Sequence, residues 1–227
     1  MSVTRISVII PMYNASRFIG EAVQSVLAQT APVDQIIVVD DGSTDDSVAR
    51  VPIDPTVSVL QGPHAGIAPT LNRGIEAARG EFITFLDADD RWLPTKIERQ
   101  IDAFHQNSAL EILFTQGTVF RDNAAAAPDA KTPVVNGVCK SSMMLTRAAL
   151  ARVGSFSGAT GAHDFMDWYA RAKELPAQID MVETVLFERR IHDANDGIVN
   201  QAAQRQNYFD TIKTILERRR AQGRDSR

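Results

Sequence analysis

The chain has 227 residues, 44% of them hydrophobic, with a formal net charge of −4 and a sequence pI near 5.6. This suffices for a buried core, and the acidic balance argues against a dedicated nucleic-acid binder, which would carry a basic domain. A single cysteine, Cys139, excludes an intrachain disulfide and a cysteine-based zinc site, so we expect a reducing, cytoplasmic setting. No apolar run reaches the length of a membrane span, and no signal peptide precedes the first expected strand.

The first hundred residues alternate between predicted strands and helices. Short apolar runs predict buried strands at residues 6–10, 35–39, 57–60 and 82–86. Apolar residues spaced for one helical face predict helices at residues 18–27, 67–75 and 94–107. Asn14 or Ser16 is suited to cap the first helix. This order predicts an α/β fold, in which helices flank both faces of a mostly parallel, Rossmann-like sheet.

After residue 107 the pattern becomes irregular. Short strands are predicted at residues 111–114, 118–120, 143–147, 178–182 and 186–190. A loop is predicted at residues 122–133, and helices are expected at residues 163–174 and 201–220. This half therefore predicts a smaller, mixed portion of the same domain.

Two predicted strands end in carboxylates. Asp40 and Asp41 follow the second strand, and Asp87 and Asp89 follow the strand at residues 82–86. The carboxyl ends of parallel strands meet at one edge of the sheet, where ligands bind. Alternating carboxylates suit a hard divalent cation that phosphate oxygens also hold, although an acidic turn that merely begins a helix is the simpler alternative.

The pair of acidic strand ends suits a sugar nucleotide. Such a ligand needs acceptors for a base N–H and for ribose hydroxyls, together with a cation for its diphosphate. The chain has no G-x-x-x-x-G-K-[ST] loop, and no G-x-G-x-x-G follows its first strand. We therefore expect a metal ion, and not a glycine-rich loop, to neutralise the phosphates.

Four motifs in order resemble those of the family 2 glycosyltransferases, which have the GT-A fold. They are SVIIPMYN at residues 7–14, IIVVDDGSTD at 36–45, GIAPTLNRG at 66–74 and GEFITFLDADD at 80–90. Looser agreement continues at residues 153–156, 163–164 and 190–195. The resemblance implies one domain, with a nucleotide-sugar-binding half at residues 1–107, an acceptor-side half at 108–199, and a C-terminal helix with a basic tail at 200–227.

The resemblance also implies a donor site. The matching donor-binding positions are Pro11, Tyr13, Asp40, Asp41, Asn72, Arg73, Asp87 and Ala88. Asp40 would accept the N–H of the nucleobase, and Asp87 would hold the ribose. The implied cofactor is Mn²⁺ or Mg²⁺, with Asp89 as its main ligand, Asp87 sharing it, and His192 closing on the diphosphate or its metal.

The implied general base is Asp164, at the start of a predicted helix. The family usually has Glu-Asp here, whereas this chain has His163 and Asp164, with Asp167 one helical turn further. We favour Asp164 because a carboxylate at a helix start would face the cleft. Asp167 and His163 are the alternatives, and Asp164 as a plain helix cap also stays open.

The predicted reaction is an inverting, metal-dependent transfer of a sugar from a UDP- or dTDP-linked donor to an acceptor hydroxyl. The acceptor stays open among glycans, lipid-linked sugars, small molecules and peptides, as does the oligomeric state. A domain that binds nucleotide or glycan without turnover is the main alternative, and a sugar-phosphate nucleotidyltransferase is a lesser one. The basic cluster at residues 218–227 predicts a solvated tail or a peripheral contact with the inner membrane face.

Overall fold

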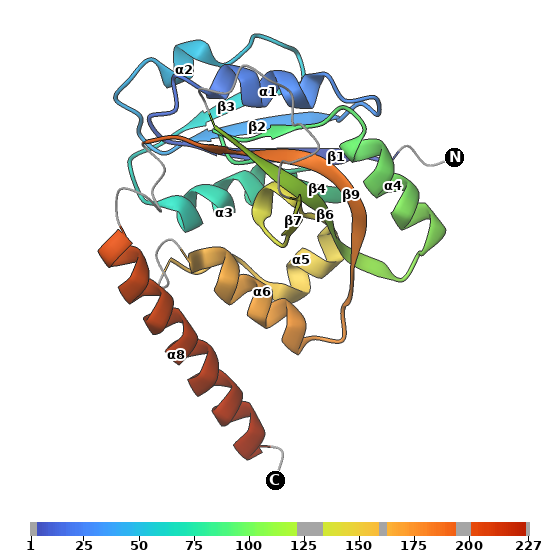
Figure 1. Ribbon diagram of the computed structural model, residues 1–227, viewed down its shortest axis with the longest axis vertical. Coiled ribbons are helices and arrows are strands. Elements are labelled where there is room, and N and C mark those ends of the chain that lie inside the picture. Colours follow the sequence, from blue (N-terminus) through green and yellow to red (C-terminus); the bar gives the residue numbers. More distant parts are fainter. Residues whose placement is uncertain (1–3, 122–133, 159–162, 194–200, 226–227) are drawn as a thin grey trace.

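The computed structural model describes residues 4–121, 134–158, 163–193 and 201–225 (Figure 1). The predicted loop at residues 122–133 lies outside this described part. The strands are β1 (Ile6–Met12), β2 (Gln35–Asp40), β3 (Val57–Gln61), β4 (Phe82–Phe85), β5 (Arg91–Trp92), β6 (Leu110–Arg121), β7 (Val134–Gly137), β8 (Met144–Thr146) and β9 (Gln178–Ile191). The helices are α1 (Ile19–Leu27), α2 (Ser47–Arg50), α3 (Ile67–Ala77), α4 (Lys96–Gln106), α5 (Arg147–Val153), α6 (Asp164–Glu174) and α8 (Gln201–Asp225), with a 3-10 turn, η1 (Lys140–Ser142).

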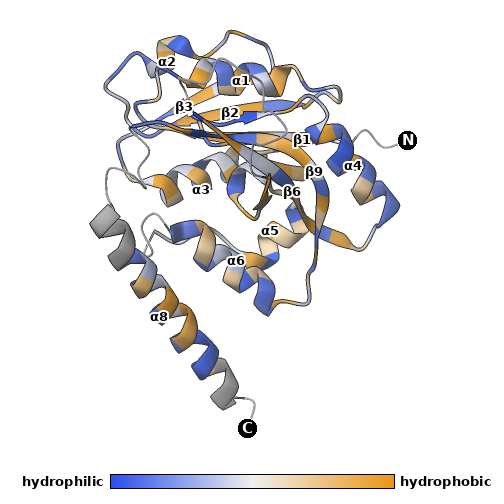
Figure 2. Cartoon of the chain, in the orientation of Figure 1, coloured by the Kyte–Doolittle hydropathy of each residue, from blue (hydrophilic) through white to orange (hydrophobic). Residues whose placement is uncertain are grey.

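The first half of the chain builds a parallel sheet. Strand β1 pairs in parallel with β2 on one side and β4 on the other, and β2 pairs with β3. Alternate side chains enter opposite cores: Val8 and Ile10 share a core with α1 and α4, whereas Ile9 shares one with α3, α5 and α6. Much of β1 and β2 is accordingly coloured as hydrophobic in Figure 2. The predicted α/β fold with helices on both faces is confirmed.

The second half adds a mixed portion to the same sheet, whose order is β3-β2-β1-β4-β8-β6-β9-β5, with β7 beside β6. Strand β8 runs antiparallel to both β4 and β6, while β9 runs parallel to β6. The separate short strands predicted at residues 111–114 and 118–120 are wrong, because β6 is one irregular strand. Gly117 ends no strand there: its missing side chain leaves room for the ring of Phe187.

Two further details differ from the sequence prediction. Residues 178–191 form the single strand β9, where two short strands were expected. Helix α1 begins at Ile19 without a side-chain cap, so the predicted caps Asn14 and Ser16 are wrong. Asn14 has φ 47° and its side-chain oxygen accepts the Thr44 N–H at 2.8 Å, so it fastens the loop after β2 to the end of β1.

Helix α8 extends away from the sheet and docks on α6 (Figure 1). It runs beyond the predicted end at residue 220, to Asp225. Thr211 and Ile215 are buried on its docked side, while Phe209 and Leu216 stay exposed. Among the described residues, no helix is both long and apolar enough to cross a membrane.

Candidate active site

The carboxyl ends of β2 and β4 lie on one edge of the sheet. Asp40 ends β2 opposite Met12 of β1, and the register of β4 carries Asp87 to the level of Pro11, which is buried in β1. Because β1 alone separates the two strands, their acidic ends are two strand spacings apart, about 10 Å. A nucleoside diphosphate is long enough to bridge them.

Asp41 organises the loop that precedes α3. Its carboxylate accepts the backbone N–H groups of Ala65 and Gly66 at 2.8 and 2.9 Å, and it lies 2.9 Å from the imidazole of His64. Gly42 has φ 77°, and a side chain there would meet the backbone nitrogen of His64 at 2.8 Å. Asp41 is therefore engaged in holding this loop against the end of β2.

Asp40 and Arg73 lie together beyond that loop. Asp40 is almost fully buried and accepts the Ser43 N–H at 3.2 Å. The guanidinium of Arg73 donates to the carbonyl of Leu60 at 3.0 Å and contacts the carbonyl of Asp40 at 3.4 Å. Arg73 thus braces the ends of β2 and β3 and brings positive charge next to Asp40.

Tyr13 provides an exposed aromatic face near the same edge. The residue is 47% exposed, and its ring stacks on His64, with centroids 4.3 Å apart and an interplanar angle of 27°. The sequence offered no motif for His64, because its place depends on the bonds that Asp41 makes to the loop. The pair gives a flat surface on which a planar base can stack.

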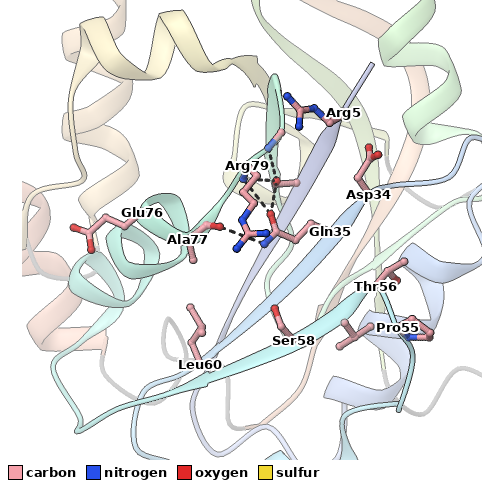
Figure 3. A pocket seen from close by; sticks show the side chains of 13 residues that line it. Arg5, Asp34, Gln35, Pro55, Thr56, Ser58, Leu60, Glu76, Ala77 and Arg79 are labelled. Atoms are coloured by element: carbon pink, nitrogen blue, oxygen red, sulfur yellow. Dashed lines mark hydrogen bonds between the residues drawn. The ribbon is translucent and has the colours of Figure 1, made fainter. Parts of the chain in front are cut away.

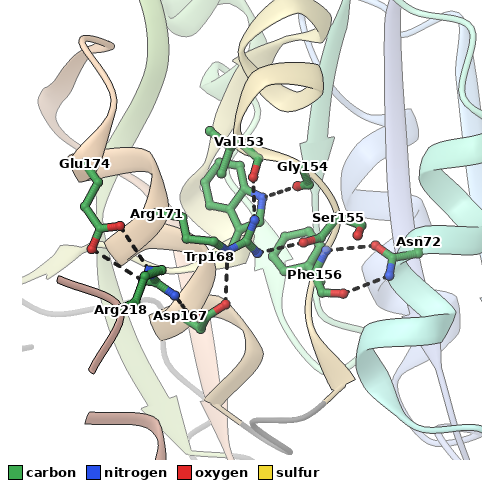
Figure 4. A network of polar contacts seen from close by, with 10 residues as sticks. All are labelled: Asn72, Val153, Gly154, Ser155, Phe156, Asp167, Trp168, Arg171, Glu174 and Arg218. Carbon is green, nitrogen blue, oxygen red and sulfur yellow. Dashed lines mark hydrogen bonds and ion pairs between the residues drawn. The ribbon is translucent and has the colours of Figure 1, made fainter. Parts of the chain in front are cut away.

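Asn72 joins the two halves of the chain. Its Nδ2 donates to the carbonyl of Phe156, and its Oδ1 accepts the Phe156 N–H, both at 2.9 Å (Figure 4). These bonds tie α3 to the segment after α5. Both ends of the Asn72 amide are bonded to the backbone of Phe156, so a donor contact would require the amide to leave these partners. That contact stays a prediction.

The acidic turn after β4 concentrates negative charge. Burial raises the pKa of Asp87; Lys140 lowers it, and the charges of Asp89 and Asp164 raise it further. Burial and the charges of Asp89 and Asp87 raise the pKa of Asp90 well above its usual range. Ionised together, these carboxylates repel one another, which favours a bound cation at this edge.

His192 lies over the same turn. Its Nε2 is 3.1 Å from a carboxylate oxygen of Asp89, and its ring packs on Phe18 with centroids 4.4 Å apart. The side chain of Ala88 is buried in the hydrophobic core, so any contact of this residue with the sugar donor would have to come from its backbone. In the described part of the chain, no three His, Cys, Asp or Glu side chains group as a metal site. The residues predicted to hold metal thus form one close pair, Asp89 and His192, with Asp87 as a neighbour.

Arg190 supports the acidic turn from behind. Its backbone N–H donates to Asp90 and its Nε donates to the carbonyl of Asp89, both at 3.0 Å. Its guanidinium also pairs with Glu21 of α1 and lies 4.9 Å from the ring centroid of Phe18. The end of β9 therefore fixes the conformation of the turn that carries the predicted ligands.

Asp164, the predicted base, is the first residue of α6 and is fully buried. The Nζ of Lys140 lies 3.2 Å from each of its carboxylate oxygens. Burial alone would lower the pKa of Lys140, but Asp164 and Asp87 outweigh it and raise that pKa. Lys140 reaches this position because β8 returns antiparallel to β4, which brings the preceding turn η1 beside Asp87.

The alternative bases face other partners. Asp167 lies 3.0 Å from the Nε of Arg171 through one oxygen and 2.7 Å from the guanidinium of Arg218 through the other (Figure 4). The ring of His163 packs edge-on against Tyr208 of α8, with centroids 5.8 Å apart. Both side chains thus contact the interface between α6 and α8.

A separate groove of about 680 Å³ opens at the other edge of the sheet, near the amino ends of β1, β2 and β3 (Figure 3). Its lining mixes Arg5 and Arg79 with Glu76 and Asp34. None of the site residues predicted from the sequence lines it. This groove is therefore separate from the acidic strand ends.

Sequence comparison finds relatives among glycosyltransferases. A family model described as "Glycosyl transferase family 2" matches residues 7–150. Chondroitin synthase of Escherichia coli is 25% identical over 225 residues, covering 94% of this chain and 33% of that protein. The putative teichuronic acid biosynthesis glycosyltransferase TuaG of Bacillus subtilis (strain 168) is 38% identical over 108 residues, covering 45% of this chain and 43% of that protein. The chain spans less than half the length of each of these two relatives.

Solved structures share the fold. The crystal structure of S. aureus TarS matches with a TM-score of 0.69 and 16% identity, over 93% of this chain and 39% of that chain. Crystal structures of TarS 1–349 in complex with UDP and with UDP-GlcNAc match with TM-scores of 0.69 and 0.66. They cover 64% and 60% of those chains, and 93% and 84% of this one. The likeness extends the predicted GT-A type fold to both halves of the molecule.

Proposed function

Because the chain belongs to glycosyl transferase family 2, we propose that it transfers a sugar from a UDP- or dTDP-linked donor to an acceptor hydroxyl. The observation that carries this proposal is the position of the two acidic strand ends. Asp40 and Asp87 lie two strand spacings, about 10 Å, apart on one edge of the sheet, within reach of one nucleoside diphosphate. On the acceptor side, Asp164 pairs with Lys140, whose turn η1 bonds the backbone of Asp87 through Ser141. The complexes of TarS with UDP and with UDP-GlcNAc support this class of donor.

The nucleobase would bind beside β2. Asp40 would accept a ring N–H, with Arg73 nearby, while Tyr13 and His64 would offer their stacked face to the ring. Pro11 and Asp41 would shape the pocket from within the sheet and the loop. Asp87, two strands away, would hold the ribose, so the diphosphate would extend towards Asp89.

We propose Mn²⁺ or Mg²⁺ at the end of β4, held by Asp89 and His192 with Asp87 beside them. Carboxylates suit these ions, which commonly take one or two protein carboxylates and complete their shell with phosphate oxygens and water. Burial raises the pKa of Asp87, and the charges of Asp89 and Asp164 raise it further, so a cation bound here would relieve their mutual repulsion. When bound, the ion would neutralise charge on the leaving diphosphate.

Asp164 is our proposed general base. One of its oxygens would take the proton of the acceptor hydroxyl while the hydroxyl oxygen attacks the anomeric carbon opposite the diphosphate. The bond from that carbon to the diphosphate oxygen breaks in the same step, its electron pair leaves with the diphosphate, and the configuration inverts. Asp167 bridges two arginines at the interface with α8, and His163 packs on Tyr208 there, whereas Asp164 pairs with the lysine of the turn beside the end of β4; we therefore favour Asp164 over both alternatives.

A domain that binds a nucleotide without turnover is the second candidate. It is favoured by one observation: Asp164 is fully buried and paired with Lys140. Nucleotidyl transfer to a sugar phosphate is less favoured, because residues 11–14 provide no glycine-rich basic loop.

We also propose a cytoplasmic protein with a peripheral membrane contact through the basic end of α8. Arg218 and Arg219 are bonded to Glu174 of α6, so within the described part of this cluster the lipid-facing charge would come mainly from the exposed Arg220. Sedimentation with phosphatidylserine vesicles, at low and high salt, tests this contact.

A thermal-shift experiment tests the donor class and the cation. We expect UDP or dTDP to raise the melting temperature when Mn²⁺ is present, through binding to the folded state worth about 2.7 kcal/mol at 100 times Kd. Asp89→Ala should abolish the shift, and the exposed Asp102→Ala should keep it.

An equal shift in the presence of a chelator would remove the metal from the proposal. No shift with any nucleotide would remove the donor class. A metal-dependent shift with no transfer or donor hydrolysis from any UDP- or dTDP-sugar would favour the binding domain instead.

A further inference from the structure

Lys140 is the charged group that links the two sides of the candidate active site. Its side chain is 12% exposed, and its Nζ lies 3.2 Å from both oxygens of Asp164. The next residue, Ser141, accepts the backbone N–H of Asp87 at the end of β4. Lys140 therefore pairs with an acceptor-side carboxylate from a turn that is bonded to the donor side.

The turn that carries Lys140 is anchored to the acidic turn. The Oγ of Ser141 donates to Asp90 at 2.8 Å and accepts the backbone N–H of Asp87 at 3.1 Å. The carbonyl of Ser141 accepts the indole N–H of Trp92 at 2.7 Å. Because its backbone is held in this way, Lys140 can fix Asp164 relative to the end of β4.

We propose that Lys140 is a positioning residue for sugar transfer, which orients Asp164 for proton abstraction and balances its charge during the step. The inference rests on the proposed function. Each carboxylate oxygen has two lone-pair directions, so Asp164 keeps acceptor sites free when each oxygen accepts one bond from Lys140.

The charge balance follows from the reaction itself. The acceptor proton moves to Asp164, which loses its charge, and an electron pair moves to the departing diphosphate, which gains charge. Lys140 keeps its proton throughout. It stabilises the carboxylate of Asp164 before the step, and its turn is bonded to the end of β4, the side to which the negative charge moves.

The test compares Lys140→Met, which removes the charge at similar length, with Lys140→Gln, which keeps a hydrogen-bond donor. The exposed Lys173→Met of α6 is the matched control. Release of UDP or dTDP from a panel of UDP- and dTDP-sugars gives kcat, and the UDP thermal shift with Mn²⁺ reports donor binding. We expect Lys140→Met to lower kcat about 100-fold, as misplacement of a reacting group does, while the UDP shift stays. Lys140→Gln should lower kcat less than Lys140→Met does, and Lys173→Met should leave kcat unchanged.

A double-mutant cycle separates positioning from a general structural role. In an Asp164→Asn background, Lys140→Met should change the residual rate less than about twofold, because both changes remove the same function. Equal losses in the two backgrounds, unchanged kcat in both Lys140 variants, or a lost UDP shift with normal kcat would each overturn the inference. A wild-type chain that releases nucleotide from no donor would overturn the proposed function, and this inference with it.

Discussion

The two sides of the candidate active site are held together by different forces. On the donor side, Asp40 and Asp87 follow parallel strands whose backbone register sets their separation. On the acceptor side, Asp164 and Asp167 begin a helix whose place depends on ion pairs with Lys140, Arg171 and Arg218.

This difference has a consequence for stability and for sensitivity to mutation. Backbone hydrogen bonds within a sheet buried on both faces are insensitive to salt and to most side-chain changes. Ion pairs that hold a helix fail when one partner is removed, because the other charge stays buried. We therefore expect the fold of the donor side to tolerate single side-chain changes, and the acceptor side to lose activity or stability when one partner of an ion pair is removed.

The largest expected effect is that of Asp164→Asn. The amide keeps the shape of the side chain but cannot take a proton, so turnover should fall about 10²- to 10⁴-fold. The UDP thermal shift should persist, since the donor side keeps its carboxylates. Donor release and the thermal shift, measured on the same preparations with Asp102→Asn as the control, check both statements. Loss of the UDP shift would mean that the two sides are not separable in this way.

Asp167→Asn should have the opposite signature. It removes the charge of a buried carboxylate that two arginines share, and it should lower the free energy of unfolding by roughly 2 kcal/mol. This loss is smaller than the loss from breaking a fully buried ion pair, because both arginines are partly exposed. Turnover per folded molecule should stay near that of the wild type. Urea denaturation measures the free energy of unfolding, and initial rates measure turnover. A variant of normal stability without turnover would instead make Asp167 the base.

The donor side is also the part that the sequence predicts well. Strands β2 and β4 are short apolar runs, and a crossover between parallel strands brings their acidic ends to one edge without knowledge of distant contacts. Lys140 escaped prediction because its position depends on β8, a three-residue strand that runs back along β4. Gly117 suggested a break between strands because the ring that fills its space, that of Phe187, comes from far along the chain.

Lys96 is a buried amine on the donor side, and among the described residues no carboxylate is bonded to it. Its Nζ donates to Gln100 at 2.7 Å and lies 4.0 Å from the ring centroid of Trp92. Burial lowers its pKa well below the ordinary value of 10.5. The folded state therefore disfavours the charged amine, and wild-type stability should rise with pH between the lowered folded pKa and 10.5.

Lys96→Met should remove this pH dependence and stabilise the protein by roughly 1–2 kcal/mol at neutral pH, after the lost bond to Gln100 is counted. The gain in stability should be smaller at pH 9, because deprotonating Lys96 on folding costs less free energy there than at neutral pH. Melting curves of wild type and variant at both values test the sign. A gain that grows with pH, or a destabilised variant at neutral pH, would show that the amine is charged and satisfied in the folded state.

The smallest effect on UDP binding is expected where the two sides meet, at Asn72. Asn72→Ala removes two hydrogen bonds to the backbone of Phe156 and should cost about 1–2 kcal/mol of stability. Asn72→Asp should cost at least as much, because one carboxylate oxygen would then face the Phe156 carbonyl oxygen without a proton between them. If Asn72 only connects α3 to the segment after α5, the affinity for UDP should change less than about twofold in both variants, and the donor side should remain folded. A large loss of UDP affinity at unchanged stability would assign Asn72 to the donor site, because its amide would then have to leave Phe156 when the nucleotide binds.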